Sequence, residues 1–453
     1  MWHWRNLMYN SSHTSDLSSS MSSSSVSSAM LDENELALVS KSVDIDGLSK
    51  SAANGSVQSV IESVAINVVK NLFLQEKYDE VIKVTTELLE EKETAFLFKA
   101  RGESFAKLHM HEKSIKDFFI ALELDDACYK THNNIGLAYK EMGMLANAAQ
   151  HLEKAIKLNQ DFAEAYNNYG NVKSEQSDLV SARKSYLKSI DLRSDDPAAF
   201  WNLHSTCNDI DHAKAVLELC IEKDRTYEPA IYSLATINAY KGNNEFLDWI
   251  LASSMASDST LRSVQWILSL PEKPKLLFNR WAVLDFAIRH SLKNRAFYEF
   301  GVWMGESFRY IFKNFERSYG FDSFEGLPED WHNIKMGTYS SYGQIPKLNG
   351  PEFVVGNFEE TLPRFFSEAE RPLAGLINLD ADLYSSTICA LDNSHPVIDD
   401  KTILVFDELI VNQNWEEDEF KALIEYCKTY GLSYEVSCVS LFTKQVVLRV
   451  YRP

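Results

Sequence analysis

A step of 34 residues recurs in the first half of this 453-residue chain, and it constrains the fold more than any other feature. Gly102, Gly136 and Gly170 are separated by this step. The same spacing relates Ala121, Ala155 and Ser189; Ser114, Ala148 and Ala182; and Phe118, Leu152 and Tyr186. Small residues at fixed places let two antiparallel helices approach closely, and the large residues fill the space beside them. The spacing therefore predicts a stack of similar helical hairpins.

This period resembles that of the tetratricopeptide repeat. Three units are clear, over residues 95–128, 129–162 and 163–196, with weaker units before and after them. Weak terminal units are expected, because they cap the stack. The resemblance implies a helical solenoid over residues 57–265 and names no ligand.

Paired asparagines fall on the first helix of adjacent repeats, at Asn133, Asn134, Asn167 and Asn168. Two interpretations stay open. The amides could grip an extended peptide from a protein partner, or they could belong to a solvated helix face.

Residues 1–56 are dominated by serine, and we expect a disordered tail, because such a segment buries too little apolar surface to offset its ordering entropy. It would serve as a tether or modification site, or be dispensable, with the true start at Met21 or Met30. The opening residues, MWHWRNLMYN, do not have the pattern of a signal peptide. No window reads as a membrane span.

The formal net charge of -20 argues against nucleic acid and anionic membranes as partners. None of the six cysteines forms a C-x-x-C pair. We expect reduced, mostly buried thiols and a cytoplasmic protein.

Residues 270–453 change period: short apolar runs alternate with amphipathic helical patterns. The alternation predicts a parallel sheet covered by helices. The last two runs, LSYEVSCVS and QVVLRVY, are separated by a short turn and predict an antiparallel hairpin. In such sheets ligands bind beyond the carboxyl ends of the strands.

Polar and glycine residues follow the predicted strands. Gly301 and Gly305 would let the backbone turn sharply near a ligand. Asp322, 21 residues after Gly301, stands where a ribose-binding carboxylate falls in doubly wound folds, or it caps a helix. Asn357 could bond an adenine edge or start a turn. The glycine pattern is incomplete for a nicotinamide dinucleotide.

The next two strands end on acids. Asp380 and Asp382 are two residues apart in an extended chain, so they face the same crevice. Asp407 and Glu408 end the following strand and could complete an oxygen site suited to Mg²⁺. The alternative is that these four acids cap helices.

Five blocks, in order and spacing, carry a further resemblance: EFGVWMGES, YGFDSFEGLPEDW, GNFEETLP, INLDADLYSST and ILVFDE. Together they resemble the macrocin O-methyltransferase family, a branch of the class I S-adenosylmethionine-dependent methyltransferases. The resemblance implies a Rossmann-like class I methyltransferase domain over 270–453 and a hydroxyl of a sugar, glycan or related small molecule as acceptor.

The same resemblance implies roles for individual residues. Glu299, Gly301, Gly305 and Ser307 would hold the methionine end of S-adenosylmethionine, Asp322 the ribose, and the block containing Asn357 the adenine. Asp380, Asp407 and Glu408 would bind magnesium, and Asp382 would be the general base.

A metal-bound hydroxyl loses its proton more readily, and a nearby carboxylate can take that proton.

The long segment 333–350 is expected to form a mobile lid, with Lys335, Tyr339 and Tyr342 as substrate contacts. His332 and His395 are alternative bases.

Trp303 is bulky for a cofactor loop, and it favours a second hypothesis, a repeat-based protein-binding scaffold with a degenerate cofactor domain. A third hypothesis keeps the enzyme but makes the acceptor a protein or carrier-bound glycan, which the repeats deliver.

Overall fold

The computed structural model describes residues 55–453 of the chain. The chain divides into two compact units, residues 1–77 and residues 78–453. In the first unit the structure describes one long helix, α4 (Gly55–Leu74). The expected serine-rich tail lies outside the described residues, apart from its last two positions. The expected boundary between solenoid and sheet, at 265–270, falls inside the second unit.

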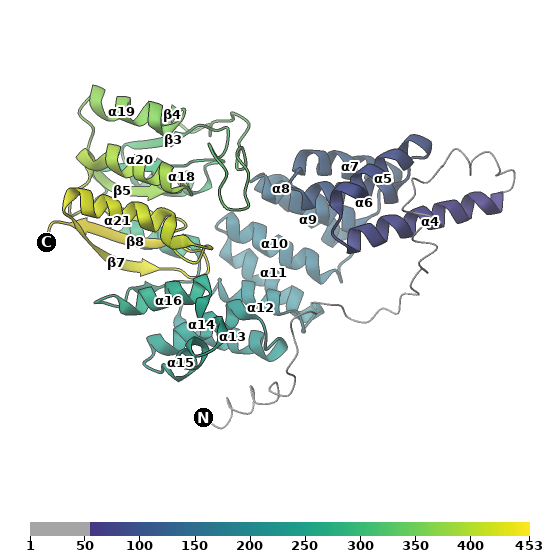
Figure 1. Ribbon diagram of the computed structural model, residues 1–453, viewed down its shortest axis with the longest axis horizontal. Coiled ribbons are helices and arrows are strands. Elements are labelled where there is room, and N and C mark those ends of the chain that lie inside the picture. The colour runs from purple at the N-terminus through teal and green to yellow at the C-terminus, as the bar shows by residue number, and fades with distance from the viewer. Residues whose placement is uncertain (1–54) are drawn as a thin grey trace. The chain divides into compact units, whose positions relative to one another are not determined.

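The N-terminal part of the second unit is a solenoid of paired helices, as the 34-residue period predicts (Figure 1). Consecutive helices pack as antiparallel pairs, and the three predicted repeats correspond to α6 with α7, α8 with α9, and α10 with α11. The helices are α5 (Tyr78–Glu91), α6 (Ala95–Lys107), α7 (His111–Leu124), α8 (Tyr129–Glu141), α9 (Leu145–Leu158), α10 (Ala163–Glu175), α11 (Leu179–Leu192), α12 (Pro197–His204), α13 (Ile210–Lys223), α14 (Glu228–Tyr240), α15 (Glu245–Leu251) and α16 (Ser259–Ser269).

The repeated glycines lie where the two helices of each repeat touch. A Cβ added at Gly136 would lie 2.6 Å from Cγ of Leu152, sixteen residues further on. Gly102 faces Phe118 and Gly170 faces Tyr186 in the same way, at 2.8 and 2.5 Å. These distances are too short for a methyl group, so the 34-residue spacing is a packing requirement, as predicted.

The C-terminal part is one eight-stranded mixed sheet with helices (Figure 1). The strands lie in the order β1-β7-β8-β6-β5-β2-β3-β4. Strands β2 to β6 are parallel, and β8 lies antiparallel between β6 and β7. The strands are β1 (Lys275–Leu276), β2 (Ala296–Phe300), β3 (Ser318–Asp322), β4 (Glu352–Val355), β5 (Ala374–Leu379), β6 (Ile403–Phe406), β7 (Ser433–Val439) and β8 (Val446–Tyr451).

The predicted parallel sheet and final hairpin are confirmed, and the short strand β1 was not expected. The chain runs outward from β2 to β4 on one side and from β5 to β6 on the other. The order therefore changes direction between β2 and β5, which is where doubly wound sheets form a crevice.

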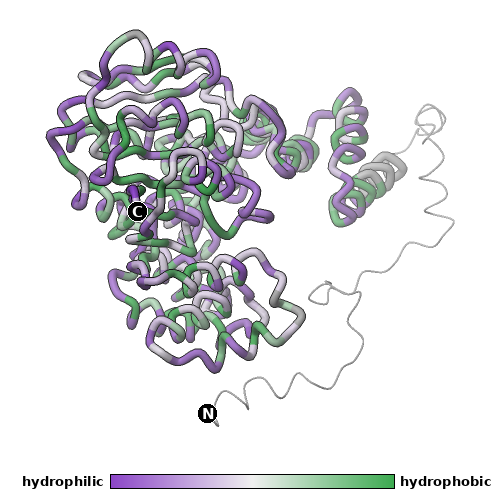
Figure 2. Tube along the Cα trace, turned by 60° about the vertical axis from the view of Figure 1, so that its left-hand side comes forward, coloured by the Kyte–Doolittle hydropathy of each residue, from purple (hydrophilic) through white to green (hydrophobic). Residues whose placement is uncertain are grey.

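Alternate residues of each strand pack on opposite faces of the sheet. Phe297, Leu376 and Val405 pack with α17 (Arg280–His290) and α18 (Glu306–Ile311). Their neighbours along the strands pack with α19 (Phe358–Glu368), α20 (Tyr384–Ser394) and α21 (Glu419–Tyr430). Figure 2 shows the hydropathy of each described residue along the chain trace, with hydrophobic and hydrophilic stretches distributed over both the helices and the sheet.

The last solenoid helices share their hydrophobic core with the second of these faces, so the solenoid and the sheet are joined by packing. Polar contacts add to this joint. The side chain of Asn279 caps α17 and donates to the carbonyl oxygen of Ser205, at 2.9 Å. The indole nitrogen of Trp281 donates to the carbonyl oxygen of Ser174 in α10. The hydrogen bonds to Ser205 and Ser174 hold the start of α17 against the solenoid.

Two further expectations can be compared with residues 55–453. All six cysteines are free thiols, and four of them are buried. Over the same range, no helix combines the length and the apolar character that crossing a membrane requires.

Candidate functional site

A cleft of about 1060 Å³ lies at the carboxyl ends of β2, β3, β5 and β6. Most of the residues singled out from the sequence line it: Gly301, Ser307, Asp322, Tyr339, Asn357, Asp380, Asp382, Asp407 and Glu408. The crevice expected at the change of strand direction is therefore present, and residues from four strand ends and their following loops converge there.

The loop after β2 is tightly held. Gly301 has a φ of +88°, and a Cβ at this position would lie 1.8 Å from the carbonyl oxygen of Asp380, so only glycine fits. One oxygen of Asp322 accepts the backbone N–H groups of Val302 and Trp303, both at 2.7 Å. The predicted ribose-binding carboxylate thus also fixes the loop that follows β2.

Glu299 lies behind this loop and is fully buried. Its Oε1 accepts a hydrogen bond from the Ser307 hydroxyl at 2.6 Å, while Oε2 has no partner among the described residues. Burial raises the pKa of Glu299 to about 8. Gly305 takes a left-handed conformation against Pro346 and does not line the cleft.

Asp382 occupies the turn between β5 and α20. Its φ is +61°, which is uncommon for a residue with a side chain and indicates a conformation held by its surroundings. The carboxylate lines the cleft and forms no hydrogen bond or ion pair with the residues that the structure describes. Burial, with Glu408 and Asp407 nearby, raises its pKa well above the ordinary value. An unpaired carboxylate that faces a cleft is suited to accept a proton.

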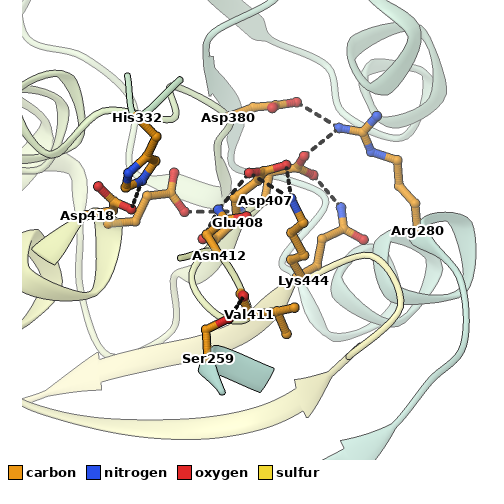
Figure 3. A network of polar contacts seen from close by, with 12 residues as sticks. Ser259, Arg280, His332, Asp380, Asp407, Glu408, Val411, Asn412, Asp418 and Lys444 are labelled. Atoms are coloured by element: carbon orange, nitrogen blue, oxygen red, sulfur yellow. Dashed lines mark hydrogen bonds and ion pairs between the residues drawn. The ribbon is translucent and has the colours of Figure 1, made fainter. Parts of the chain in front are cut away.

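The three predicted magnesium ligands are paired with groups of the chain itself (Figure 3). Nη2 of Arg280 lies 3.0 Å from Oδ2 of Asp380 and 2.8 Å from Oδ2 of Asp407. Over residues 55–453, no group of three His, Cys, Asp or Glu side chains is arranged to hold a metal ion. The predicted set therefore does not fit a magnesium ion in this arrangement.

Glu408 is bound in a similar way. Nζ of Lys444 lies 3.2 Å from its Oε1, and Nδ2 of Asn412 donates to its Oε2 at 2.7 Å. Its backbone N–H donates to Glu419, which is fully buried and has one oxygen without a partner in the described chain. Sequence reasoning missed both cations, Arg280 and Lys444.

Of the three predicted substrate contacts, only Tyr339 lines the cleft. Its ring packs edge-on against Trp303, with the centroids 5.9 Å apart. Lys335 is exposed and pairs with Asp330, and Tyr342 is 59% exposed. Whether the segment 333–350 moves as a lid stays a prediction. Backbone hydrogen bonds from Gly337 to Leu327 and from Gly343 to Phe324 tie this segment to the loop that precedes it.

The two alternative bases lie outside the cleft lining. Nε2 of His332 contacts a carboxylate oxygen of Asp418 at 2.8 Å. Nδ1 of His395 contacts the hydroxyl of Tyr426 at 2.9 Å, and its ring stacks on Tyr430. Their surroundings indicate structural roles.

The solenoid forms one wall of the same cleft, a contact that was not predicted from the sequence. Residues from α8 to α12 contribute to this wall, among them Lys140, Glu141, Leu145, Asn171, Ser174, Glu175, Tyr186 and Asn202. Lys140 pairs with Glu141 at 2.9 Å and with Glu175 at 3.3 Å, so a charged cluster faces the strand ends.

The repeated asparagines bond to one another and to glutamates. Nδ2 of Asn168 donates to Oδ1 of Asn133 at 2.9 Å, and Nδ2 of Asn202 donates to Oδ1 of Asn167 at 3.0 Å. Asn134 donates to Glu103 at 2.9 Å. Asn133 and Asn168 are buried and Asn134 and Asn167 are half-buried, so these amides connect neighbouring repeats; peptide binding by them stays a prediction.

Comparisons with known proteins identify the solenoid. The family model for the tetratricopeptide repeat matches residues 129–162, which is the second predicted repeat. Comparison with curated proteins gives no match.

Similar solved structures cover part of the chain. MamA is 18% identical and covers 36% of this chain and 96% of its own, with a TM-score of 0.33. PilF of Pseudomonas aeruginosa is 14% identical and its match covers 45% of this chain and 96% of the PilF chain, with a TM-score of 0.40. YrrB is described as a tetratricopeptide-repeat protein with an unusual peptide-binding site. It is 21% identical, and its match covers 37% of this chain and 91% of the YrrB chain, with a TM-score of 0.31. The match of the family model, confined to the solenoid, shows that the chain contains a tetratricopeptide repeat.

Proposed function

We propose that the chain is an S-adenosylmethionine-dependent O-methyltransferase whose cofactor and acceptor share the cleft at the strand ends. The observation that carries the proposal is the convergence on that cleft of Gly301, Asp322 and Asp382, from the ends of three strands. The order of the parallel strands adds support, since doubly wound sheets bind nucleotides where the strand order reverses.

The residues present fit the cofactor in two respects. Gly301 lines the cleft and has no side chain, so its backbone, which packs against the carbonyl oxygen of Asp380, is uncovered on the cleft side. Oε2 of Glu299 is buried behind the loop, outside the cleft lining, and lacks a partner among the described residues; an ammonium group brought beside it would supply that partner and favour the ionised carboxylate. Bound S-adenosylmethionine would supply an electrophilic methyl group at the strand ends.

Asp382 is the proposed general base. Its unpaired carboxylate would accept a hydrogen bond from the acceptor hydroxyl and then take the proton as the oxygen becomes nucleophilic. The solenoid wall and Tyr339 would restrict water and orient the acceptor. Because solenoid residues line the cleft, an acceptor carried on a protein or a carrier-bound glycan is as suited to it as a free sugar.

Isothermal calorimetry with S-adenosylmethionine tests the proposal. We expect one site per chain, and Asp322→Asn should bind about 10- to 100-fold more weakly, because it weakens charge-assisted hydrogen bonds that fix the loop. Asp400→Asn, at an exposed turn outside the cleft, is the matched control and should bind normally. Absence of binding by the unaltered chain contradicts the proposal.

For an acceptor that the chain methylates, Asp382→Asn should lower kcat by about 10²- to 10⁴-fold, because the base is lost. Affinity for S-adenosylmethionine should stay within about threefold of the unaltered chain, which separates loss of the base from loss of the fold. Transfer of a radiolabelled methyl group measures the rate. If Asp382→Asn transfers the methyl group at an undiminished rate, another group removes the proton from the acceptor hydroxyl.

One observation favours a second function, a protein-binding scaffold. Exposed apolar side chains recur on the second helices of the repeats. Leu124 and Leu158 are one repeat length of 34 residues apart, and Phe119 and Leu187 are separated by two repeat lengths. Regularly spaced apolar residues on a solenoid suit a protein partner. The calorimetry above separates the two functions, because a scaffold with a degenerate cofactor domain gives no heat with S-adenosylmethionine.

A further inference from the structure

The acids at the ends of β5 and β6 are bridged by a single nitrogen of one arginine. Nη2 of Arg280 contacts Asp380 and Asp407 at 3.0 and 2.8 Å, as Figure 3 shows. A divalent cation chelated by these two carboxylates would also have to lie within bonding distance of both. The guanidinium group therefore occupies the position between the acids that a metal ion would need.

The remaining oxygens of this group are also engaged by the chain. Oδ1 of Asp407 accepts from the side-chain amide of Gln445. Glu408 pairs with Lys444 and Asn412. Two fixed cations, Arg280 and Lys444, therefore neutralise part of the negative charge that would otherwise attract a metal.

The position of Arg280 is determined from both sides by the solenoid. It is the first residue of α17, between Asn279, which bonds the carbonyl oxygen of Ser205, and Trp281, which bonds that of Ser174. An arginine at the start of a helix that is fixed at two points loses little conformational freedom when it pairs with carboxylates. The solenoid thus holds the cation in place.

From this geometry we infer that Arg280 replaces the divalent cation, so that the acidic cluster at the strand ends binds no metal. The acids are needed to hold the guanidinium, and the guanidinium supplies the positive charge beside the acceptor. An acceptor then has no need of two adjacent hydroxyls to chelate a metal. The activity part of this inference rests on the proposed function, and the binding part does not.

Manganese binding tests the inference directly, because the electron paramagnetic resonance signal of free Mn²⁺ falls when the ion binds. With the full chain we expect the same signal as in buffer. Arg280→Ala should remove one equivalent of free Mn²⁺ per chain, because it exposes Asp380 and Asp407 to each other. Arg280→Lys retains a cation and should remove none.

Arg295→Ala is the matched control, since Arg295 forms a bidentate pair with a single carboxylate, Asp399, outside the cleft. Its loss should create no manganese site. Stoichiometric Mn²⁺ binding by the unaltered chain, abolished by Asp380→Asn, overturns the inference. That measurement needs no substitution of Arg280, so it decides the question even if Arg280→Ala does not fold.

The outcomes for the two proposals are separable. A chain that binds S-adenosylmethionine and also binds Mn²⁺ retains the proposed function and loses this inference. A chain that binds neither loses the proposed function, while the assignment of Arg280 as the internal cation stands. If methyl transfer is found, it should be unchanged by EDTA, and loss of activity with EDTA that is restored by Mg²⁺ contradicts the inference.

Discussion

At the scale of single residues, the site depends on how buried acids are compensated. Asp380 and Asp407 share Arg280, whereas Glu299 has only the Ser307 hydroxyl at one oxygen and no partner at the other. A carboxyl group in such surroundings favours its protonated form. The same burial that suits Glu299 to an ammonium ligand thus makes it sensitive to pH.

The pH dependence of stability should reveal this group. Burial raises the pKa of Glu299 to about 8 from its ordinary value of 4.5. The folded chain therefore holds this proton more tightly than the unfolded chain, and the resulting stabilisation is complete below the unfolded pKa and lost as the pH rises through about 8. The melting temperature should fall less between pH ~5 and ~9 in Glu299→Gln than in the unaltered chain.

Differential scanning fluorimetry across that pH range measures the effect without cofactor. Glu435→Gln, which changes an exposed glutamate on β7, should keep the slope of the unaltered chain. Identical slopes for Glu299→Gln and the unaltered chain would show that Glu299 titrates normally.

At the scale of secondary-structure elements, the paired helices of each repeat depend on one close contact. A large side chain of the second helix packs directly on the glycine of the first helix. This side chain differs between the three repeats and is Phe118, Leu152 or Tyr186. The size of the partner therefore varies while the requirement for glycine does not.

Gly136→Ala should destabilise the chain by about 1–3 kcal/mol, because the new methyl group would lie 2.6 Å from Leu152. In a Leu152→Ala background the same change should be neutral or stabilising by up to about 1 kcal/mol, since alanine favours helix over glycine once space is available. Urea unfolding of the four variants measures the free energies as a double-mutant cycle. Equal costs in both backgrounds would mean that the two side chains do not compete for space.

At the scale of the whole second unit, solenoid and sheet share a core. Leu234 in α14 belongs to the same buried cluster as Leu404 and Phe406 in β6. The central strands therefore depend on a helix about 170 residues earlier in the chain, and the solenoid cannot be regarded as a separate accessory to the sheet.

Leu234→Ala should cost about 2–5 kcal/mol and should speed amide hydrogen exchange in β6 as well as in α14, because one cooperative core opens. Leu152→Ala changes a different buried cluster, in the middle repeats, and should leave exchange in β6 closer to that of the unaltered chain. Mass spectrometry of deuterated peptides resolves the two regions. Unchanged exchange in β6 on loss of Leu234 would indicate independent folding of the two parts.

The sequence by itself determined the features that depend on local periodicity. The 34-residue step placed the repeats, and the apolar runs placed seven of the eight strands. It also brought Asp380, Asp382 and Asp407 to one edge, because parallel strands end on the same side of a sheet. These features can be predicted from the sequence because each depends on interactions between residues that are close in the chain.

Only the tertiary structure decided what those acids face. Arg280 pairs with carboxylates 100 and 127 residues further on, and nothing in its own stretch, FNRW, marks it as their partner. The solenoid wall of the cleft is likewise a contact between distant segments. Charge compensation between such segments depends on how they dock, so a pattern of acids that suggests a metal can instead hold an arginine.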